Sequence, residues 1–200
     1  MRFPGTPGPP GFQEVPVSAL PHAEPIRTAR LDLLPLRVDH AEEMAVVLSD
    51  PALHTFIGGS PLDAAALRAR YERLVAGSPD PAVSWCNWVL RLREESAPLG
   101  GKEFAPLTGT VQATVTDRGA AAEIAWVVGT PWQGRGLASE AARGLAGWLR
   151  EHGVRTVLAH IHPDHTASAA VATAAGLAPT GEEQDGEQRW RLTGGPPDSP

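Results

Sequence analysis

The feature that most constrains the fold of this chain is a strand-like segment that leads through a glycine-rich turn into a helical pattern. Residues 124–128 are apolar, Gly134 and Gly136 follow, and helical spacing begins at Leu137. Glycines let the backbone approach a ligand closely, and the free amides of a first helical turn favour negative charge. The segment therefore predicts an anion site, although a structural helix entry that needs flexible residues has the same pattern.

The patterns on both sides of this turn predict one α+β domain with a mixed sheet. The expected order begins with a strand at 31–36, helices after Asp39 and Ser60, and three strands between 84 and 128 with turns at 98–101 and 117–119. It continues with a helix from Leu137, a strand at 154–161, a helix at 166–175 and a hairpin ending near Trp190. Asp39 with Glu42 predicts a capping box, and Ser60 predicts an N-cap. Pro35 places its strand at an edge or end of the sheet, and Gly153 is expected to cap the long helix.

The length and composition fit a single domain. The chain has 200 residues, of which 42% are hydrophobic, enough for one core and too few for two comfortable ones. Residues 1–26 and 193–200 are rich in Pro and Gly, so we expect them to be flexible and to flank a folded domain at 27–192. The single cysteine, Cys86, lies in a strand-like context and is expected to be a core residue rather than a nucleophile.

Charge and hydropathy narrow the class of partner. A net charge of -6 without a basic cluster argues against nucleic acid and mildly favours a cationic acceptor such as an amine. No stretch approaches the roughly 20 apolar residues of a membrane-spanning helix, and the N-terminus lacks the apolar core of a secretory signal. We therefore expect a cytoplasmic protein that binds no membrane. The sequence is compatible with a monomer and with a homodimer.

The turn also carries a recognisable motif. Gln133, Gly136 and Ala138 have the spacing Gln-x-x-Gly-x-Ala after a strand, which resembles the acetyl-CoA pyrophosphate motif of the GCN5-related N-acetyltransferase (GNAT) superfamily. Residues 28–36 resemble the opening strand of its ribosomal-protein-alanine acetyltransferase-like (RimJ/RimL-like) branch. Residues 162–177 resemble the last segment that contacts coenzyme A. The resemblance covers the whole of the expected domain.

The resemblance implies a fold, a reaction and a set of cofactor contacts. The fold would be a mixed, largely antiparallel twisted sheet flanked by helices. Acetyl-CoA would be the co-substrate, without a metal, and a primary amine of a small molecule or a protein N-terminus would attack its thioester directly in a ternary complex. The residues implied to bind acetyl-CoA are Val127, Val128, Gln133, Gly134, Arg135, Gly136, Leu137, Ala138, His165 and Ser168. Amides around Val127 and Val128 would polarise the thioester carbonyl, and His165 stands where the family usually has asparagine.

Three residues are candidates for catalysis. Glu123 stands where related sequences often carry an acid, so it is either the base that deprotonates the amine or an acid that is solvated or paired with a basic neighbour. His162 shares a strand face with His160 and is either a base or a packed side chain. Ser168 is a candidate to protonate the leaving thiolate, because Ala172 stands where many members have a tyrosine. Proton donation by water and unassisted release of the thiolate remain open.

The acceptor is expected to enter from the side opposite coenzyme A. Its site would be lined by residues of the two early helices and by some of Trp85, Trp88 and Trp126. These tryptophans are equally compatible with a place in the core.

The same residues are also compatible with three other functions. The His-x-His-x-Asp-His string at 160–165 is typical of metallo-β-lactamase-like hydrolases that bind zinc, yet no histidine follows His165. Gly134 and Gly136 after a strand also suggest a dinucleotide-binding domain, but Ser139 stands where the third glycine is expected. A catalytically silent acyl-CoA-binding sensor would keep the turn and lose the base.

Overall fold

The computed structural model describes residues 20–93 and 105–192 of the chain. Its strands are β1 (Ile26–Arg27), β2 (Leu31–Pro35), β3 (Ser84–Leu92), β4 (Leu107–Thr116), β5 (Ala121–Val128), β6 (Thr156–Ile161), β7 (Leu177–Gln184) and β8 (Glu187–Leu192). Its α-helices are α1 (Ala41–Val47), α2 (His54–Ile57), α3 (Ala64–Ala76), α4 (Leu137–Glu151) and α5 (Thr166–Ala174). The turn predicted at 98–101 and the flexible ends predicted at 1–19 and 193–200 lie outside the described residues. Within the described ranges, no helix is long and apolar enough to cross a membrane.

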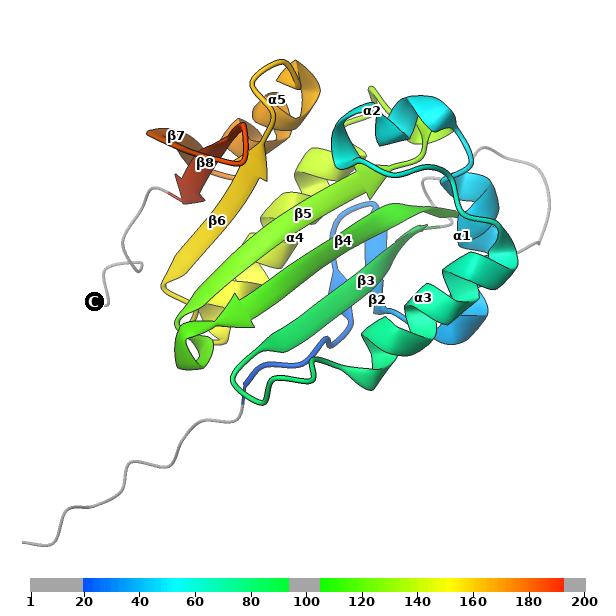
Figure 1. The fold of residues 1–200 in the computed structure, drawn as a ribbon, viewed down its shortest axis with the longest axis horizontal. Helices are drawn as coiled ribbons and strands as arrows, with labels where there is room; N and C mark the ends of the chain where they lie inside the picture. Colours follow the sequence, from blue (N-terminus) through cyan, green and yellow to red (C-terminus); the bar gives the residue numbers. More distant parts are fainter. Residues whose placement is uncertain (1–19, 94–104, 193–200) are drawn as a thin grey trace, which may run out of the picture.

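The described strands form one twisted sheet in the order β1-β2-β3-β4-β5-β6-β8-β7 (Figure 1). Neighbouring strands are antiparallel except for β5 and β6, which run parallel. The fold predicted from the resemblance, a mixed and largely antiparallel sheet flanked by helices, is confirmed. The parallel pairing joins only residues 121–123 of β5 to residues 156–158 of β6. Beyond Glu123 the two strands separate, and this opening positions the candidate site.

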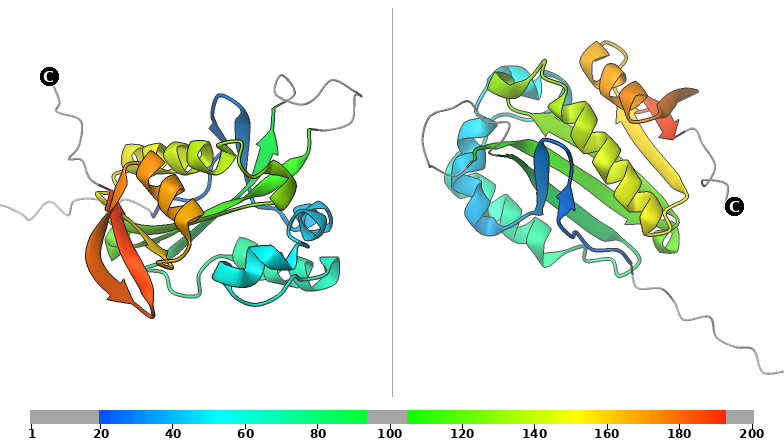
Figure 2. Two further views of the ribbon diagram at one scale, coloured as in Figure 1. Left: turned by 90° about the horizontal axis from the view of Figure 1, so that it is seen from above. Right: turned by 180° about the vertical axis from the view of Figure 1, so that it is seen from behind.

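Helices cover both faces of the sheet (Figure 2). On one face, alternate residues of β3 and β4 pack against α4, because side chains one residue apart on a strand point to opposite faces. This core includes Cys86, Trp88, Val111, Leu145 and Trp148. The rings of Trp88 and Trp148 meet edge to face with centroids 5.2 Å apart. Cys86 is fully buried and burial raises the pKa of its thiol, which confirms its predicted place in the core.

The opposite face is covered by α1, α2 and α3 (Figure 2). A smaller apolar cluster on this side joins Met44 and Val47 of α1 to Leu67 and Tyr71 of α3 and to Val89 of β3. These contacts hold α1 and α3 close to β3 and β4 in the interior of the sheet. The part of this face nearer β5 and β6 is lined by polar side chains and carries one of the two cavities described below.

Two predicted helix caps were wrong. Asp39 was expected to open the first helix, but its carboxylate instead accepts two hydrogen bonds from Arg37, at 2.9 and 2.8 Å. Ser60 was expected to cap the second, but Asp63 does so by accepting from Ala66 N at 2.8 Å. Arg37 thus engages the carboxylate of Asp39, and Asp63 takes the capping place that was predicted for Ser60. The turn at 117–119 and the cap at Gly153 (φ 83°) were predicted correctly.

The folded part of the chain begins earlier than the predicted boundary at residue 27. Ile26 and Arg27 form β1, which pairs with β2. The carbonyl oxygen of Pro21 accepts a hydrogen bond from Ser84 Oγ at 2.6 Å, and that of Glu24 accepts one from Trp88 Nε1 at 2.7 Å. Residues 20–26 therefore pack against the sheet, although their proline-rich composition predicted a flexible segment.

Candidate functional site

Two cavities lie side by side where β5 and β6 separate. The turn cavity, about 630 Å³, is lined by the 133–139 segment, the end of β5 and residues 164–171 around the start of α5. The sheet cavity, about 600 Å³, is lined by α2, α3 and polar residues of β3, β4, β5 and β6. The residues that line both cavities are Phe56, Ile57, Trp126, Val127, His165 and Ser168. The two cavities therefore meet at these residues, and a group held in one is within reach of a group held in the other.

The residues predicted to bind acetyl-CoA gather around the turn cavity. Its lining includes Val127, Val128, Gln133, Gly134, Gly136, Leu137, Ala138, His165 and Ser168. Arg135 is the predicted contact that lies outside this lining. Its side chain is exposed, and its carbonyl oxygen accepts a hydrogen bond from Arg30 Nη1 at 2.9 Å.

The turn itself is shaped by backbone conformation. Gly134 and Gly136 have φ angles of 70° and 73°, in the left-handed region that other residues rarely adopt. The first hydrogen bond of α4 runs from Glu140 N to the Gly136 carbonyl at 3.1 Å. The amides of Leu137, Ala138 and Ser139 therefore have no acceptor within the helix, and they form the positive end of its dipole. A phosphate bound at the turn would accept hydrogen bonds from these amides.

The end of β5 has a free edge on the side of β6. Val127 and Val128 pair with Thr110 and Gly109 of β4, but the ladder to β6 has already ended at Glu123. Gln133 ties the turn to this strand end, because its Nε2 donates to the Val128 carbonyl at 3.0 Å. An extended ligand in the turn cavity would thus meet backbone groups of β5 that lack a partner strand.

Glu123 lies in the sheet cavity within a chain of polar contacts. Its Oε1 is 3.0 Å from His160 Nδ1, and Arg189 Nε donates to His160 Nε2 at 3.3 Å. Because Nε2 accepts from Arg189, the neutral imidazole carries its proton on Nδ1 and donates it to Glu123. The Glu123 side chain is 55% exposed, whereas that of His160 is 12% exposed. Glu123 is therefore both paired with a basic neighbour and open to a ligand in the sheet cavity.

His162 also lines the sheet cavity, just after the end of β6. Its Nδ1 accepts a hydrogen bond from Asp164 N at 3.1 Å, so a neutral His162 carries its proton on Nε2. His160 and His162 thus have separate partners. Among residues 20–93 and 105–192, no group of three or more histidine, cysteine, aspartate or glutamate side chains is arranged to hold a metal ion.

His165 and Ser168 lie at the junction of the two cavities. The imidazole of His165 stacks on the ring of Phe56, with centroids 4.2 Å apart and planes 8° apart. Burial lowers the pKa of His165, and nearby His162 lowers it further. His165 is therefore neutral at neutral pH, and either ring nitrogen can serve as donor or acceptor according to the tautomer.

Comparison with known proteins identifies the family. Residues 30–178 match the family model described as the acetyltransferase (GNAT) domain, which is more than half of the chain. This chain belongs to the GNAT acetyltransferase family. The matched residues of the GNAT domain include the whole 133–138 turn, Glu123, His162 and the start of α5.

Solved structures support the same fold. An acetyltransferase of the GNAT family from Bacillus anthracis has a TM-score of 0.67 at 18% identity, covering 84% of this chain and 98% of its own. The microcin C7 self-immunity acetyltransferase MccE, in complex with acetyl-CoA and AMP, has a TM-score of 0.65 at 14% identity, covering 82% and 92%. The ribosomal L7/L12 alpha-N-protein acetyltransferase RimL, in complex with coenzyme A, has a TM-score of 0.63 at 17% identity, covering 84% and 97%. A search of curated protein sequences found no significant match.

The sequence missed two parts of the GNAT domain's site. Phe56 and Ile57 belong to α2 and line both cavities, but a four-residue helix is too short to show a period. Tyr71, the only tyrosine, lines the sheet cavity, and its hydroxyl has no hydrogen-bond partner among the described residues. Burial raises the pKa of Tyr71 to about 12, so its hydroxyl stays protonated at neutral pH.

The predicted tryptophans take different places. Trp126 lines both cavities. Trp88 is fully buried and packs against Trp148 in the core, and it also lines the sheet cavity. Trp85 is half-buried on β3. Of the two early helices that the sequence predicted, α3 lines the sheet cavity, and α1 reaches it through Leu48, its C-cap residue. The unpredicted helix α2 lines it as well.

Proposed function

We propose that this GNAT domain transfers the acetyl group of acetyl-CoA to a primary amine in a ternary complex. The observation that carries the proposal is the junction of the two cavities. One cavity ends at an anion-binding turn, the other contains carboxylate and imidazole groups, and both open at Trp126, Val127 and Ser168. Such a junction brings two substrates together without a covalent enzyme intermediate.

Acetyl-CoA is proposed to occupy the turn cavity. Its pyrophosphate would accept hydrogen bonds from amides of the 134–139 segment, where two glycines and the start of α4 favour negative charge. The pantetheine arm would lie along the free edge of β5 at Val127 and Val128, and the thioester would reach the junction. The complexes of MccE with acetyl-CoA and of RimL with coenzyme A support this choice of ligand.

The acceptor is proposed to enter through the sheet cavity and to be a primary amine of a small molecule or a protein N-terminus. The carboxylates of Glu123 and Glu187 both line this cavity, and they favour a cationic group that loses its proton on the way to attack. The polar floor contributed by Asn87 and Gln112 supplies further hydrogen-bonding groups. The ribosomal-protein acetyltransferase among the structural neighbours acts on a protein N-terminus according to its name, which supports this acceptor class.

Glu123 is the proposed general base. The neutral amine attacks the thioester carbonyl, the nitrogen–carbon bond forms, and the amine proton passes to Glu123 directly or through a water molecule. The carbon–sulfur bond then breaks, and the thiolate takes a proton from Ser168 or from water. His162 is the weaker candidate for the base, because its Nδ1 already accepts from Asp164 N and its Nε2 carries the proton. No metal takes part in these steps.

The test is a free-thiol release assay with acetyl-CoA and a panel of polyamines, aminoglycosides, amino acids and N-terminal peptides. We expect turnover with at least one class of amine. Glu123→Gln should lower kcat by about 100-fold or more, as expected for loss of a general base, and should remove the acidic limb of the pH–rate profile. Its affinity for acetyl-CoA should not change.

Two further variants give this assay its controls. Glu187→Gln removes another carboxylate that lines the sheet cavity, so it should alter KM for the amine with little change in kcat. His162→Ala should keep most of the activity, and loss of turnover in His162→Ala alone would assign the base to His162 instead. Full activity in both Glu123→Gln and His162→Ala would reject both residues. Cofactor binding without thiol release for any amine would show that the domain is an acyl-CoA-binding sensor.

A further inference from the structure

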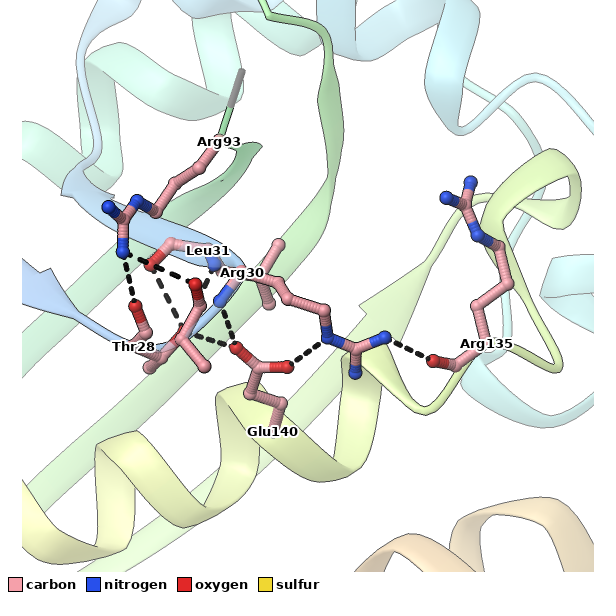
Figure 3. Close-up of polar contacts among 7 residues, drawn as sticks. Thr28, Arg30, Leu31, Arg93, Arg135 and Glu140 are labelled. Carbon is pink, nitrogen blue, oxygen red and sulfur yellow. Dashed lines mark hydrogen bonds and ion pairs between the residues drawn. The ribbon is translucent and has the colours of Figure 1, made fainter. Parts of the chain in front are cut away.

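A buried carboxylate follows the 133–139 turn directly in the sequence. Glu140, in the first turn of α4, has a side chain that is only 10% exposed. It accepts hydrogen bonds from Thr28 Oγ1 at 2.6 Å, Arg30 N at 2.7 Å and Arg30 Nε at 2.7 Å (Figure 3). Burial alone would raise the pKa of Glu140, but these hydrogen bonds outweigh burial and lower it. Glu140 is therefore ionised and held in one position by the segment before β2.

Arg30 connects this carboxylate to the turn. Its Nε contacts Glu140 Oε2, and its Nη1 donates to the carbonyl oxygen of Arg135 at 2.9 Å (Figure 3). The guanidinium group is planar and rigid, so fixing one end fixes the direction of the other. A Cβ atom placed on Gly136 would lie 3.6 Å from Arg30 Nη2. Arg30 thus packs against the turn from the side of β2.

The bond to the Arg135 carbonyl determines where the next amide points. In a trans peptide the C=O of one residue and the N–H of the next point in opposite directions, and the structure contains no cis peptide among its described residues. Holding the Arg135 carbonyl towards Arg30 therefore directs the Gly136 N–H away from Arg30. Gly136 lines the turn cavity, on the side where the pyrophosphate is proposed to bind.

We propose that Arg30 is a positioning residue for cofactor binding, which acts with Glu140 to fix the Arg135–Gly136 peptide so that the turn is ready to bind a pyrophosphate before the ligand arrives. This inference rests on the proposed binding of acetyl-CoA. A turn with two glycines has many accessible conformations, and a fixed carbonyl removes most of them in advance. The effect is expected in cofactor affinity more than in folding.

Arg93 provides a matched control. Its Nη1 donates to the carbonyl oxygens of Thr28 and Ala29, at 3.0 and 3.2 Å, so it braces the same segment as Arg30 (Figure 3). The side chain of Arg93 donates to that segment, whereas the side chain of Arg30 also donates to the turn, at the Arg135 carbonyl. Arg30→Lys keeps a positive charge that can pair with Glu140 but loses the rigid fork that spans Glu140 and the Arg135 carbonyl.

The experiment measures the Kd for acetyl-CoA by calorimetry for the wild type, Arg30→Lys and Arg93→Gln, with thermal unfolding of each ligand-free protein. Arg30→Lys should bind acetyl-CoA about 10-fold more weakly, the loss expected for one charge-assisted hydrogen bond. Arg93→Gln should bind within about 2-fold of the wild type, even if it unfolds at the same temperature as Arg30→Lys. With S-acetylpantetheine as donor, which has no pyrophosphate, kcat/KM should be the same for both variants.

The outcomes are distinct. If Arg30→Lys binds acetyl-CoA as the wild type does, or if Arg93→Gln loses as much affinity, Arg30 has only a structural role and the inference is overturned. If Arg30→Lys does not fold, the same comparison is made with Glu140→Gln. This variant should fold and bind acetyl-CoA more weakly than the wild type. Unchanged affinity in folded Glu140→Gln would overturn the inference. If the wild type itself does not bind acetyl-CoA, the proposed function fails before the role of Arg30 is reached.

Discussion

The turn cavity and the sheet cavity differ in how the sequence builds them. Most of the turn cavity comes from two continuous segments, the end of β5 with the 133–139 turn and the start of α5, and the left-handed Gly134 and Gly136 belong to its lining. The sheet cavity is lined by side chains from segments spread between Leu36 and Glu187. A surface made by local backbone conformation leaves a pattern in the sequence, whereas a surface assembled from distant side chains does not. The turn cavity of this GNAT domain is therefore far easier to predict from the sequence than the sheet cavity.

The largest expected effect is a loss of acetyl-CoA affinity caused by a substitution in the turn cavity. Gly136→Asp adds a negative charge to the turn proposed to bind the pyrophosphate, on the side of Arg30, whose Nη2 would lie 3.6 Å from the new Cβ. It should weaken acetyl-CoA binding by more than about 100-fold, because added negative charge repels the anionic ligand and like charges at an interface cost several kcal/mol. The sheet cavity should be unaffected. Calorimetry with acetyl-CoA on the folded variant measures this effect.

Gly136→Asn is the matched control for charge. Asparagine has nearly the same shape as aspartate and tolerates the left-handed backbone that Gly136 adopts. Its loss of affinity should be no more than about 10-fold, corresponding to about 1.4 kcal/mol. Equal affinities of the aspartate and asparagine variants would show that no anion binds at this turn.

The second expected effect is a loss of folding stability when the buried carboxylate of Glu140 is removed. Glu140→Gln should lower the free energy of unfolding by about 1–3 kcal/mol at pH 7, since it weakens hydrogen bonds to a buried charged group. The folded-state pKa of Glu140 lies below its ordinary value of 4.5, so its ionised form stabilises the fold above that pH. This contribution is lost as the pH falls through the lower folded-state pKa. The difference between wild type and variant should therefore narrow below about pH 4.5.

Denaturant unfolding between pH 7 and 3 measures this effect. Glu42→Gln is the control, because Glu42 pairs with Arg68 on the surface at 2.9 Å and its side chain is 75% exposed. Such exposed pairs contribute about 0–1 kcal/mol. A difference between wild type and Glu140→Gln that stayed constant over the whole pH range would mean that the charge of Glu140 does not stabilise the fold.

A smaller effect is expected where the two cavities meet. Phe56 lines both cavities and stacks on His165. Phe56→Ala should therefore raise KM for acetyl-CoA and KM for the amine by about 3–10-fold each, which corresponds to the loss of one aromatic contact. Phe56→Leu keeps apolar bulk and should have less effect. Steady-state kinetics with both substrates varied measures both constants. A change in only one of them would assign Phe56 to a single cavity.

The smallest expected effect is that of metal chelation. His160 is bonded to Glu123 and Arg189, and His162 accepts from Asp164 N, so the histidines of the 160–165 string have other partners. EDTA should leave acetyl-CoA binding and thiol release unchanged. Elemental analysis of the purified protein provides the check, and a stoichiometric, tightly bound zinc would restore the hydrolase hypothesis.

Sequence reasoning succeeded where the signal was local. The order of the longer strands and helices, the glycine turn at 134–136 and the buried Cys86 all follow from short patterns. It failed where the deciding partner is distant or where two local groups compete. Arg30 and Glu140 are 110 positions apart in the chain, and nothing in a single sequence pairs them. The caps at Asp39 and Ser60 were wrong because Arg37 and Asp63 offered better partners nearby.

The pairing of Glu123 with His160 illustrates the same limit in the sheet cavity. The two residues are 37 positions apart and meet where the short parallel contact of β5 and β6 ends. The sequence named Glu123 as either a base or a paired acid, and the structure shows the pairing together with exposure to the sheet cavity. The shape of that cavity depends on side chains of α2 and α3 whose positions only the folded chain defines.

The most direct test of this account is a titration of the ¹⁵N-labelled protein with coenzyme A, followed by amide resonances. The account predicts that the largest shifts occur at Gly134, Gly136 and Leu137 and at the end of β5. Amides of Asn87 and Gln112 in the sheet cavity should change little. Largest shifts at Asn87 and Gln112, with the turn amides unchanged, would contradict the assignment of the turn cavity to the cofactor.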